Sequence, residues 1–275
     1  MILSDTTQLI QSLKDREPES FALLYATYGG KIYEVAYRMT GSQAEAEDIT
    51  QETFLQVYRK VDDFRGQSQL YTWMYAIAKN LCYRHFQRAK KSSFASFEAL
   101  LDSGAEIGPS SAIKAWEKQE LVRQIKEGCL TGLVRCLAFP QRMAFILHIL
   151  LHLPVRNVAE ILDKSEAATK VLIHRARKNL RNFLCKNCSV YEPVNPCHCE
   201  DLLGFSLKQG WIERLASEKR NLPDVEQIEE EIKSVREVVE LYTQLSVPHP
   251  PQNFNRRIQQ FIVEQEGVIF ASKKV

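Results

Sequence analysis

Residues 165–186 are the stretch that most limits how this chain folds and what it binds. They contain six Lys or Arg against a single acid, Glu166. A short apolar segment and a tight turn, residues 154–164, come directly before them. The pair therefore predicts a helix-turn-helix whose second helix is basic. Such a helix fits a DNA major groove and grips the phosphates on either side.

The overall composition indicates a globular protein whose surface has little net positive charge. With 275 residues, 45% hydrophobic and 25% charged, the chain is long enough for two domains with buried cores. The net charge is only +2, so DNA binding depends on local clusters. No run approaches 18 apolar residues and no signal peptide begins the chain, so we expect a cytoplasmic protein that does not enter the membrane.

The hydrophobic pattern predicts an all-α fold, since apolar residues recur at helical spacing and no strand-like alternation occurs. Gly29 and Gly30 are expected to bend or break an early helix, and Ser42 or Thr40 to cap the next one. We expect two helical domains joined by a flexible linker, then a Cys-rich segment and a helical acidic extension. The predicted boundaries are 1–90 for the first domain, 91–115 for the linker, 116–184 for the second domain, 185–199 for the Cys-rich segment and 200–275 for the extension.

One candidate site combines a polar loop, residues 64–69, with the helix that follows it. The helix interleaves aromatic residues with Lys and Arg, an arrangement that suits single-stranded DNA, whose bases stack on aromatic rings. Alternatively, Trp73, Ile77 and Leu81 form one core face and the bases form a solvated face opposite. Spacing alone favours this alternative.

The order of several short motifs resembles region 2 of the sigma-70 family, in its extracytoplasmic-function (ECF) class. That class carries patterns close to A-x-D-x-x-Q-[ED]-x-F, then F-x-G-x-S, then T-W-x-x-x-I-A-x-N. The matching residues are Ala46, Asp48, Gln51, Glu52 and Phe54, then Phe64, Gly66 and Ser68, then Thr72, Trp73, Ile77, Ala78 and Asn80.

This resemblance implies two binding surfaces in the first domain. The β′ clamp of core RNA polymerase would be bound by Asp48, Gln51, Glu52, Phe54 and Arg59. The promoter −10 element would be melted and bound by Arg65, Gln67, Ser68, Trp73, Tyr75, Lys79, Asn80, Arg84 and Arg88. His85 stands where the family often has Asp, which leaves the preferred −10 sequence open.

The helix-turn-helix resembles region 4 of the same family. The matching residues are Pro140, Arg142, Phe145, Leu147, Ala159, Leu162, Ser165, Lys170, His174, Arg175, Ala176 and Arg177. Region 4 would bind the β flap and the −35 element, and Ser165 is placed to cap the recognition helix. The implied −35 contacts are Ser165, Glu166, Thr169, Lys170, His174, Arg175, Arg177 and Lys178.

The recognition helix departs from the family pattern T-V-K-S-R-L. Residues 168–173 read Ala-Thr-Lys-Val-Leu-Ile, so a polar Thr, a Ser and an Arg at positions that normally face DNA have become Ala, Val and Leu. Each lost polar contact costs roughly 1–3 kcal/mol of base discrimination. We expect either altered or weakened −35 recognition, or a helix face that packs against another part of the chain.

Four clustered cysteines form a third candidate site, with the spacing Cys185-x2-Cys188-x8-Cys197-His198-Cys199. Four thiolates predict a tetrahedral zinc site, with His198 as an alternate ligand; copper(I) and cadmium also suit thiolates. A reversible thiol switch and inert structural cysteines are the alternatives. The remaining Cys82, Cys129 and Cys136 are expected to be small buried apolar residues.

The extension at 200–275 carries nine acids against five bases between residues 212 and 240. It is either an intramolecular lid, doing the work of an anti-sigma protein, or a small stabilising appendix. The whole resemblance implies an alternative sigma factor, not an enzyme, that binds core polymerase and promoter DNA, initiates transcription without a cofactor and is regulated through the Cys-rich extension. The competing hypotheses are a metal- or redox-responsive DNA-binding regulator that never engages polymerase, and a sigma-like sequestering adaptor.

Overall fold

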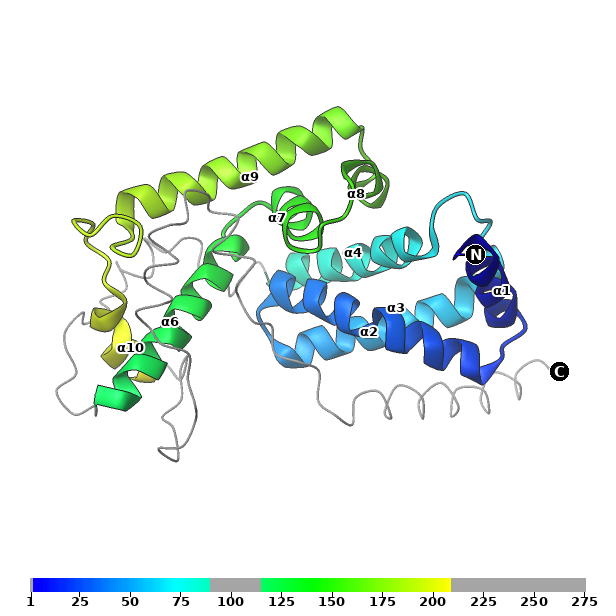
Figure 1. Ribbon diagram of the computed structural model, residues 1–275, viewed down its shortest axis with the longest axis horizontal. Helices are drawn as coiled ribbons and strands as arrows, with labels where there is room; N and C mark the ends of the chain where they lie inside the picture. Colours follow the sequence, from blue (N-terminus) through cyan, green and yellow to red (C-terminus); the bar gives the residue numbers. More distant parts are fainter. Residues whose placement is uncertain (1, 90–114, 209–275) are drawn as a thin grey trace. The chain divides into compact units, whose positions relative to one another are not determined.

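The computed structural model describes residues 2–89 and 115–208 (Figure 1). Within these ranges every regular element is helical, apart from one isolated bridge between Cys188 and Cys197, so the predicted all-α class is confirmed. The elements are α1 (Ile2–Lys14), α2 (Pro18–Thr40), α3 (Gln43–Lys60), η1 (Val61–Asp63), α4 (Leu70–Ala89), α6 (Ala115–Arg135), α7 (Phe139–Phe145), the π-helical η2 (Ile146–Leu150), α8 (Val155–Leu162), α9 (Glu166–Asn187), η3 (Cys199–Leu202) and α10 (Leu203–Lys208). None of the described helices combines the length and the apolar character needed to cross a membrane.

The described residues divide into two compact units. The first contains residues 2–89 and 153–169, and the second contains residues 115–152 and 170–208. Most of the predicted linker and of the extension after residue 208 lies outside the described residues, so the domain boundaries given above stay predictions.

Helices α2, α3 and α4 pack together in the first unit (Figure 1). Two aromatic pairs join α2 to α3: Phe21 with Tyr58, ring centroids 4.9 Å apart, and Tyr25 with Phe54, 4.8 Å apart. Tilted aromatic pairs of this kind contribute about 0.5–1.5 kcal/mol beyond the area that they bury. The pairs therefore fix how α3 is rotated about its own axis.

Helix α2 is continuous through Gly29 and Gly30, so these glycines do not break it. It begins with Pro18, whose fixed φ suits the first helical turn, and ends at Gly41, with φ 74° in the left-handed region. A Cβ at Gly29 would lie 2.7 Å from the ring of Tyr25. Glycine is thus needed at position 29 so that this aromatic ring can lie flat along its own helix.

The helix starts follow the sequence signals more closely. Ser42 is the N-cap of α3, where its hydroxyl accepts a hydrogen bond of 3.4 Å from the Glu45 N–H. Ser165 does the same before α9, accepting from the Ala168 N–H at 3.2 Å. Both predicted caps are confirmed, because a cap depends only on a side chain and backbone three residues away.

A tight turn separates α8 from α9, as the helix-turn-helix pattern predicts. The turn opens at Asp163, whose φ of 54° lies in the left-handed region. The N–H of Lys164 donates to the carbonyl of Ala159 at 3.0 Å, which closes the end of α8. Helix α9 then starts three residues after Asp163, at Glu166.

We expect the substitution Phe54→Ala to destabilise the protein by about 3–5 kcal/mol, the usual range for removing a buried Phe ring. The Phe54 side chain is 1% exposed and contacts Tyr25 of α2, so its loss leaves a cavity between two helices. Urea unfolding of the full chain measures the change.

Leu23→Ala is the matched control, because Leu23 also lies in the first unit but is 56% exposed. It should change the free energy of unfolding by no more than about 0.5 kcal/mol. Equal effects of the two substitutions would show that the Tyr25–Phe54 contact does not hold this unit together.

Candidate polymerase and nucleic-acid interfaces

The first surface is a polar stripe along α3, which we call the α3 face: Asp48, Gln51, Glu52 and Arg59. Asp48 and Arg59 are exposed, and Gln51 and Glu52 are partly buried. Residues three, four and seven apart share one side of a helix, so these four side chains can meet one partner together. Glu52 also accepts a hydrogen bond from the side chain of Gln56 at 2.9 Å, which orders the middle of the stripe.

Phe54 does not belong to this surface, although its motif position suggested polymerase contact. Its side chain is 1% exposed and packs on Tyr25 in the core of the first unit. Phe54 supports the α3 face from behind, because it holds the opposite side of α3 against α2.

The second surface starts at the loop between η1 and α4. Phe64 is buried, and its ring centroid lies 5.2 Å from that of Trp73, which anchors the loop to α4. Gly66 has φ 69°, a conformation that favours glycine and turns the chain back toward the helix. Arg65 and Gln67 are exposed and Ser68 is partly buried, so the loop presents polar groups around a fixed aromatic anchor.

Helix α4 continues this surface with a stripe of exposed polar and basic residues. Asn80, Arg84 and Arg88 recur every four residues and all three are exposed. Lys79, next to this stripe, is partly buried; burial lowers its pKa, while nearby Asp163 acts in the opposite direction. The stripe can neutralise a phosphate backbone, as the sequence predicts.

Of the two aromatic residues expected to contact −10 DNA, Trp73 is partly exposed and Tyr75 is buried. Tyr75 is 3% exposed, and burial raises the pKa of its hydroxyl well above the ordinary value, with Glu34 adding to the rise. Tyr75 is therefore a neutral core residue, not the DNA-stacking residue expected. Trp73 keeps part of its ring exposed, whereas Ile77 and Leu81 are buried. Helix α4 thus has the core face and the solvated basic face of the second alternative, and binding of single-stranded DNA stays a prediction.

Tyr71 connects α4 to α8 within the first unit. Its hydroxyl oxygen accepts a hydrogen bond from the side-chain amide of Asn157 on α8. Asn157 is itself buried, and α8 packs on α4 in this unit. The Tyr71 ring also stands edge-on to Tyr75, with centroids 6.3 Å apart.

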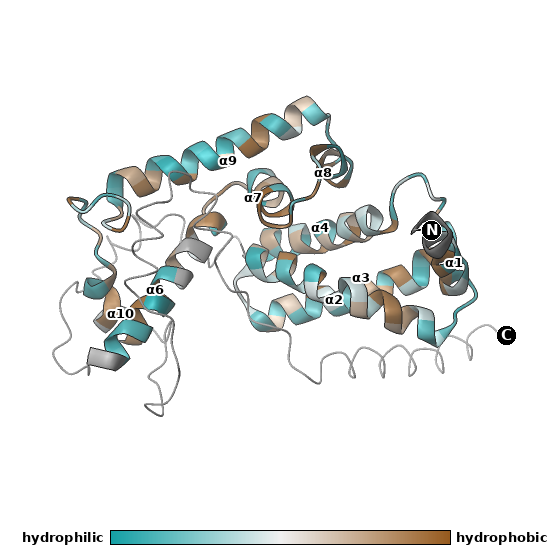
Figure 2. Cartoon of the chain, in the orientation of Figure 1, coloured by the Kyte–Doolittle hydropathy of each residue, from teal (hydrophilic) through white to brown (hydrophobic). Residues whose placement is uncertain are grey.

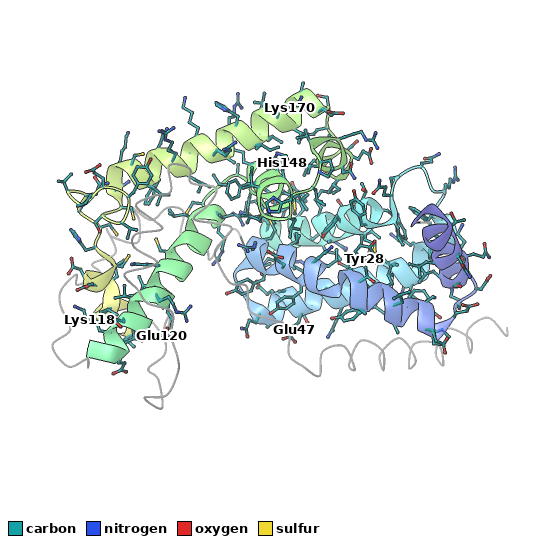
Figure 3. All side chains as sticks on the ribbon, viewed as in Figure 1. Tyr28, Glu47, Lys118, Glu120, His148 and Lys170 are labelled. Atoms are coloured by element: carbon teal, nitrogen blue, oxygen red, sulfur yellow. The ribbon has the colours of Figure 1, made fainter. Side chains whose placement is uncertain are left out.

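The third surface is the outer side of α9, which is hydrophilic over most of its length (Figure 2). Figure 3 labels Lys170 near the start of this helix. The exposed residues that the sequence assigned to −35 binding are Ser165, Glu166, Lys170, His174, Arg175 and Lys178; Arg177 is partly buried. Four of these seven side chains are Lys or Arg, so this side of α9 carries the positive charge that DNA requires.

Thr169 is the exception among the assigned −35 residues. It is fully buried, and its hydroxyl donates to the carbonyl of Ser165 at 3.0 Å. It lies on the same side of α9 as the buried Ile173, Ala176 and Leu180, so it cannot reach a base.

The Cys-rich segment folds back on the end of α9. Asn195 is buried, and its side-chain amide lies within hydrogen-bonding distance of three carbonyls, of Leu184, Cys185 and Cys188, at 3.3, 3.0 and 3.1 Å. The carbonyls of Leu184 and Cys188 also accept backbone N–H groups, so the Asn195 amide adds side-chain contacts at the end of α9. The Cys197 N–H donates to the carbonyl of Asn187 at 3.0 Å, and the Ser189 N–H donates to the carbonyl of Cys197 at 3.1 Å, which forms the isolated bridge between Cys188 and Cys197.

The segment continues from this bridge onto α6. Leu202 and Leu203 form a buried cluster with Leu121, Val122 and Ile125 of α6, and Cys197 and Cys199 pack against it. Lys118 and Glu200 form an ion pair beside the cluster, and Figure 3 labels Lys118 on α6. The start of the extension is thus docked on one face of α6.

The cysteines separate into two groups, which differs from the predicted four-thiolate site. Cys185 hydrogen-bonds with Tyr191 and Arg181. Cys129, one helical turn beyond Ile125 on α6, lies instead near Cys199, Cys188 and Cys197; burial, and then these neighbours, raise its pKa well above the ordinary value. Sequence reasoning missed Cys129, since nothing local relates it to cysteines about 60 residues later.

A metal site at the four predicted ligands is therefore not supported. Among residues 2–89 and 115–208, no three Cys, His, Asp or Glu side chains are arranged to hold a metal ion. Cys185 is engaged by the side chains of Tyr191 and Arg181, and it is not among the thiols that act on Cys129.

Two family models match the chain at the segments that carry these surfaces. Sigma-70 region 2 matches residues 24–92, which contain the α3 face, the loop and α4. Sigma-70 region 4 matches residues 127–180, which contain α7, α8 and most of α9.

Whole proteins of known class match over the same part of the chain. The ECF RNA polymerase sigma-E factor of Escherichia coli is 30% identical over 179 residues, covering 63% of this chain and 91% of that protein. The ECF RNA polymerase sigma factor BldN of Streptomyces coelicolor is 28% identical over 178 residues, and the match spans 65% of its length. A solved structure of CnrH in complex with the cytosolic domain of CnrY covers 66% of this chain and 97% of that one, with 18% identity and a TM-score of 0.47.

The chain belongs to the sigma-70 family of RNA polymerase sigma factors, in its ECF class. The relatives are RNA polymerase sigma factors by name.

Cys197 should react slowly with alkylating reagents, because burial and then nearby Cys188 raise the pKa of its thiol to about 11. The reagent attacks the thiolate, and a shift of about two units leaves roughly 100-fold less thiolate at a given pH below the pKa. The folded state holds this proton more tightly than the unfolded state. The contribution of the protonated thiol to the free energy of unfolding is therefore complete below about pH 9 and is lost as the pH rises toward 11. Iodoacetamide pulses across this range, read by peptide mass spectrometry, measure the thiolate fraction.

The chain unfolded in urea is the reference, where the thiol returns to its ordinary pKa of about 9. Identical pH profiles in the folded and unfolded chains would contradict the raised pKa.

Proposed function

We propose that this protein binds core RNA polymerase through the α3 face and directs it to promoters, where it initiates transcription. The observation that carries the proposal is the pairing, on one chain, of an exposed polar stripe in the region 2 segment with an exposed basic helix in the region 4 segment. A regulator that binds DNA alone needs the second surface and has no use for the first. The β′ clamp is the partner that the family resemblance assigns to the α3 face.

Promoter opening at the −10 element is the role we propose for the loop and α4. Arg65 and Gln67 are exposed in the loop that Phe64 anchors to the partly buried Trp73, and α4 continues with a basic stripe. Bases leaving the duplex can stack on the ring while the stripe neutralises their phosphates. Tyr75 stays in the core and contributes only by positioning α4.

Recognition of the −35 duplex is the role we propose for α9. The N-terminal residues of a recognition helix meet base edges, and basic residues further along meet phosphates. Glu166 and Lys170 occupy the first group, and Arg175 and Lys178 the second; all four are exposed. Thr169 is excluded from both groups because it is buried.

Regulation through the extension is the final part of the proposal. The docked residues 197–203 tie the Cys-rich segment to α6, and the chain then continues into the acidic residues 212–240. An acidic segment that binds DNA-binding helices competes with phosphate for the same Lys and Arg. The extension would act in this way as an intramolecular counterpart of an anti-sigma protein.

The double substitution Asp48→Ala with Gln51→Ala should weaken binding to core RNA polymerase roughly tenfold or more, as expected when central interface residues are truncated. The first unit should stay folded, since neither side chain is in the core. Fluorescence anisotropy of labelled full-length protein with purified core polymerase measures the dissociation constant.

Lys31→Ala is the control, because Lys31 is an exposed charged residue on α2 of the same unit. It should leave the affinity unchanged. If the double variant binds core polymerase as tightly as the original chain, the α3 face is not the interface and the DNA-only regulator is favoured.

The substitution Leu203→Asp should release the extension and raise run-off transcription with core polymerase severalfold. Leu203 is 1% exposed in the cluster with α6, and a buried carboxylate there has no partner in that cluster. Val194→Asp places the same charge at an 86% exposed position of the Cys-rich segment and should leave transcription unchanged. If transcription is unchanged in both variants, the proposed regulatory role of the extension is wrong.

A further inference from the structure

Val171 is an exposed apolar residue in the middle of a basic surface. It is 47% exposed, while Lys170, His174 and Arg175 beside it are exposed as well. Nearly half of its surface therefore stays open to solvent, although burial of an isopropyl group is favourable. A single exposed apolar side chain is common on protein surfaces, so its place on the helix decides what it can contact.

The phase of α9 places Val171 at the centre of the outward side. A helix turns about 100° per residue, so the buried Thr169, Ile173, Ala176 and Leu180 define one side of α9. Val171 lies nearly opposite their mean direction, and Ala167, one turn earlier, is exposed on the same line. These two residues form a short apolar strip, which Lys170 and His174 flank.

Val171 is also close to the start of the helix. It is the sixth residue of α9, which begins at Glu166. The first turns of a recognition helix are the part that meets base edges in the major groove. Val171 therefore faces the bases when Arg175 and Lys178, further along, meet phosphates.

The chemistry of the groove leaves one apolar feature for such a residue. Every base edge in the major groove offers hydrogen-bond donors or acceptors, and thymine adds its C5-methyl group. The Lys, His and Arg residues around the strip favour a polyanion over an apolar protein groove as the occupant.

We infer that Val171, with Ala167 beside it, recognises thymine methyl groups in the −35 duplex. The inference rests on the proposed −35 role of α9 and goes beyond it, since it names the base and the atom recognised. It also accounts for the departure of residues 168–173 from the family pattern. Hydrogen-bonding side chains have been exchanged for an apolar contact, so base discrimination is retained in a different form.

The test uses holoenzyme, the full chain bound to core RNA polymerase, and a promoter library with random sequence in the −35 region. Duplexes that the holoenzyme retains are sequenced, and each thymine of the selected −35 element is then replaced singly by uracil. This replacement removes the methyl group and leaves every hydrogen-bonding group of the base in place. We expect one or two thymines at which uracil weakens binding about fourfold, the effect of one buried methyl group.

The substitution Val171→Ser should abolish the uracil effect at those positions, because the serine side chain offers no apolar contact. Val194→Ser is the matched control: the same change at an 86% exposed valine outside α9 should leave the uracil effect intact. Because Val171 is exposed, its replacement leaves the fold unchanged, which a thermal melt of each variant verifies.

Two results would overturn the inference, and they are distinguishable. If a −35 sequence is selected but uracil has the same effect in the original chain and in Val171→Ser, the −35 role of α9 stands and the methyl contact is wrong. If the holoenzyme selects no −35 sequence, the −35 role itself fails and the inference fails with it.

Discussion

The contact between Tyr25 and Phe54 sets the geometry on which the first unit depends. Helix α3 has an apolar and a polar side, and this contact, with the Phe21–Tyr58 pair, decides which side turns inward. Once Phe54 is fixed against α2, Asp48 and Arg59 have to point outward, because they lie on the other side of the same helix. The ring of Tyr25 lies flat only because residue 29 is glycine. The partner-binding surface is thus set by a packing contact that the partner never touches.

Signals that act over three or four residues allowed much of the fold to be predicted from the sequence. Ser42 and Ser165 begin helices because a hydroxyl satisfies a nearby backbone N–H, and the turn at Asp163 follows from the break in apolar spacing. The polar faces of α3 and α4 could be predicted as well, since charged residues at helical spacing seldom enter a core.

The remaining features depend on rotation and distance, which no local pattern specifies. Phe54, Tyr75 and Thr169 lie within motifs whose other members are exposed, but the three are buried, since a motif lists core and surface residues together. Their assignment requires the phase of the helix against its neighbours. Cys129 joins Cys197 and Cys199 only because the chain returns to α6 after residue 196. Sequence spacing alone therefore grouped Cys185 with these cysteines and missed Cys129.

Asn195 has a consequence for how the second unit holds together. Its amide lies against the carbonyls of Leu184, Cys185 and Cys188, so the last turn of α9 and the Cys-rich segment share the same hydrogen bonds. Neither can open without exposing the polar groups of the other, which makes them one cooperative unit of local unfolding. A chemical change at the cysteines is then expected to fray the C-terminal end of α9. The helix that carries Val171 near its start is thus tied at its other end to the Cys-rich segment through the Asn195 side chain.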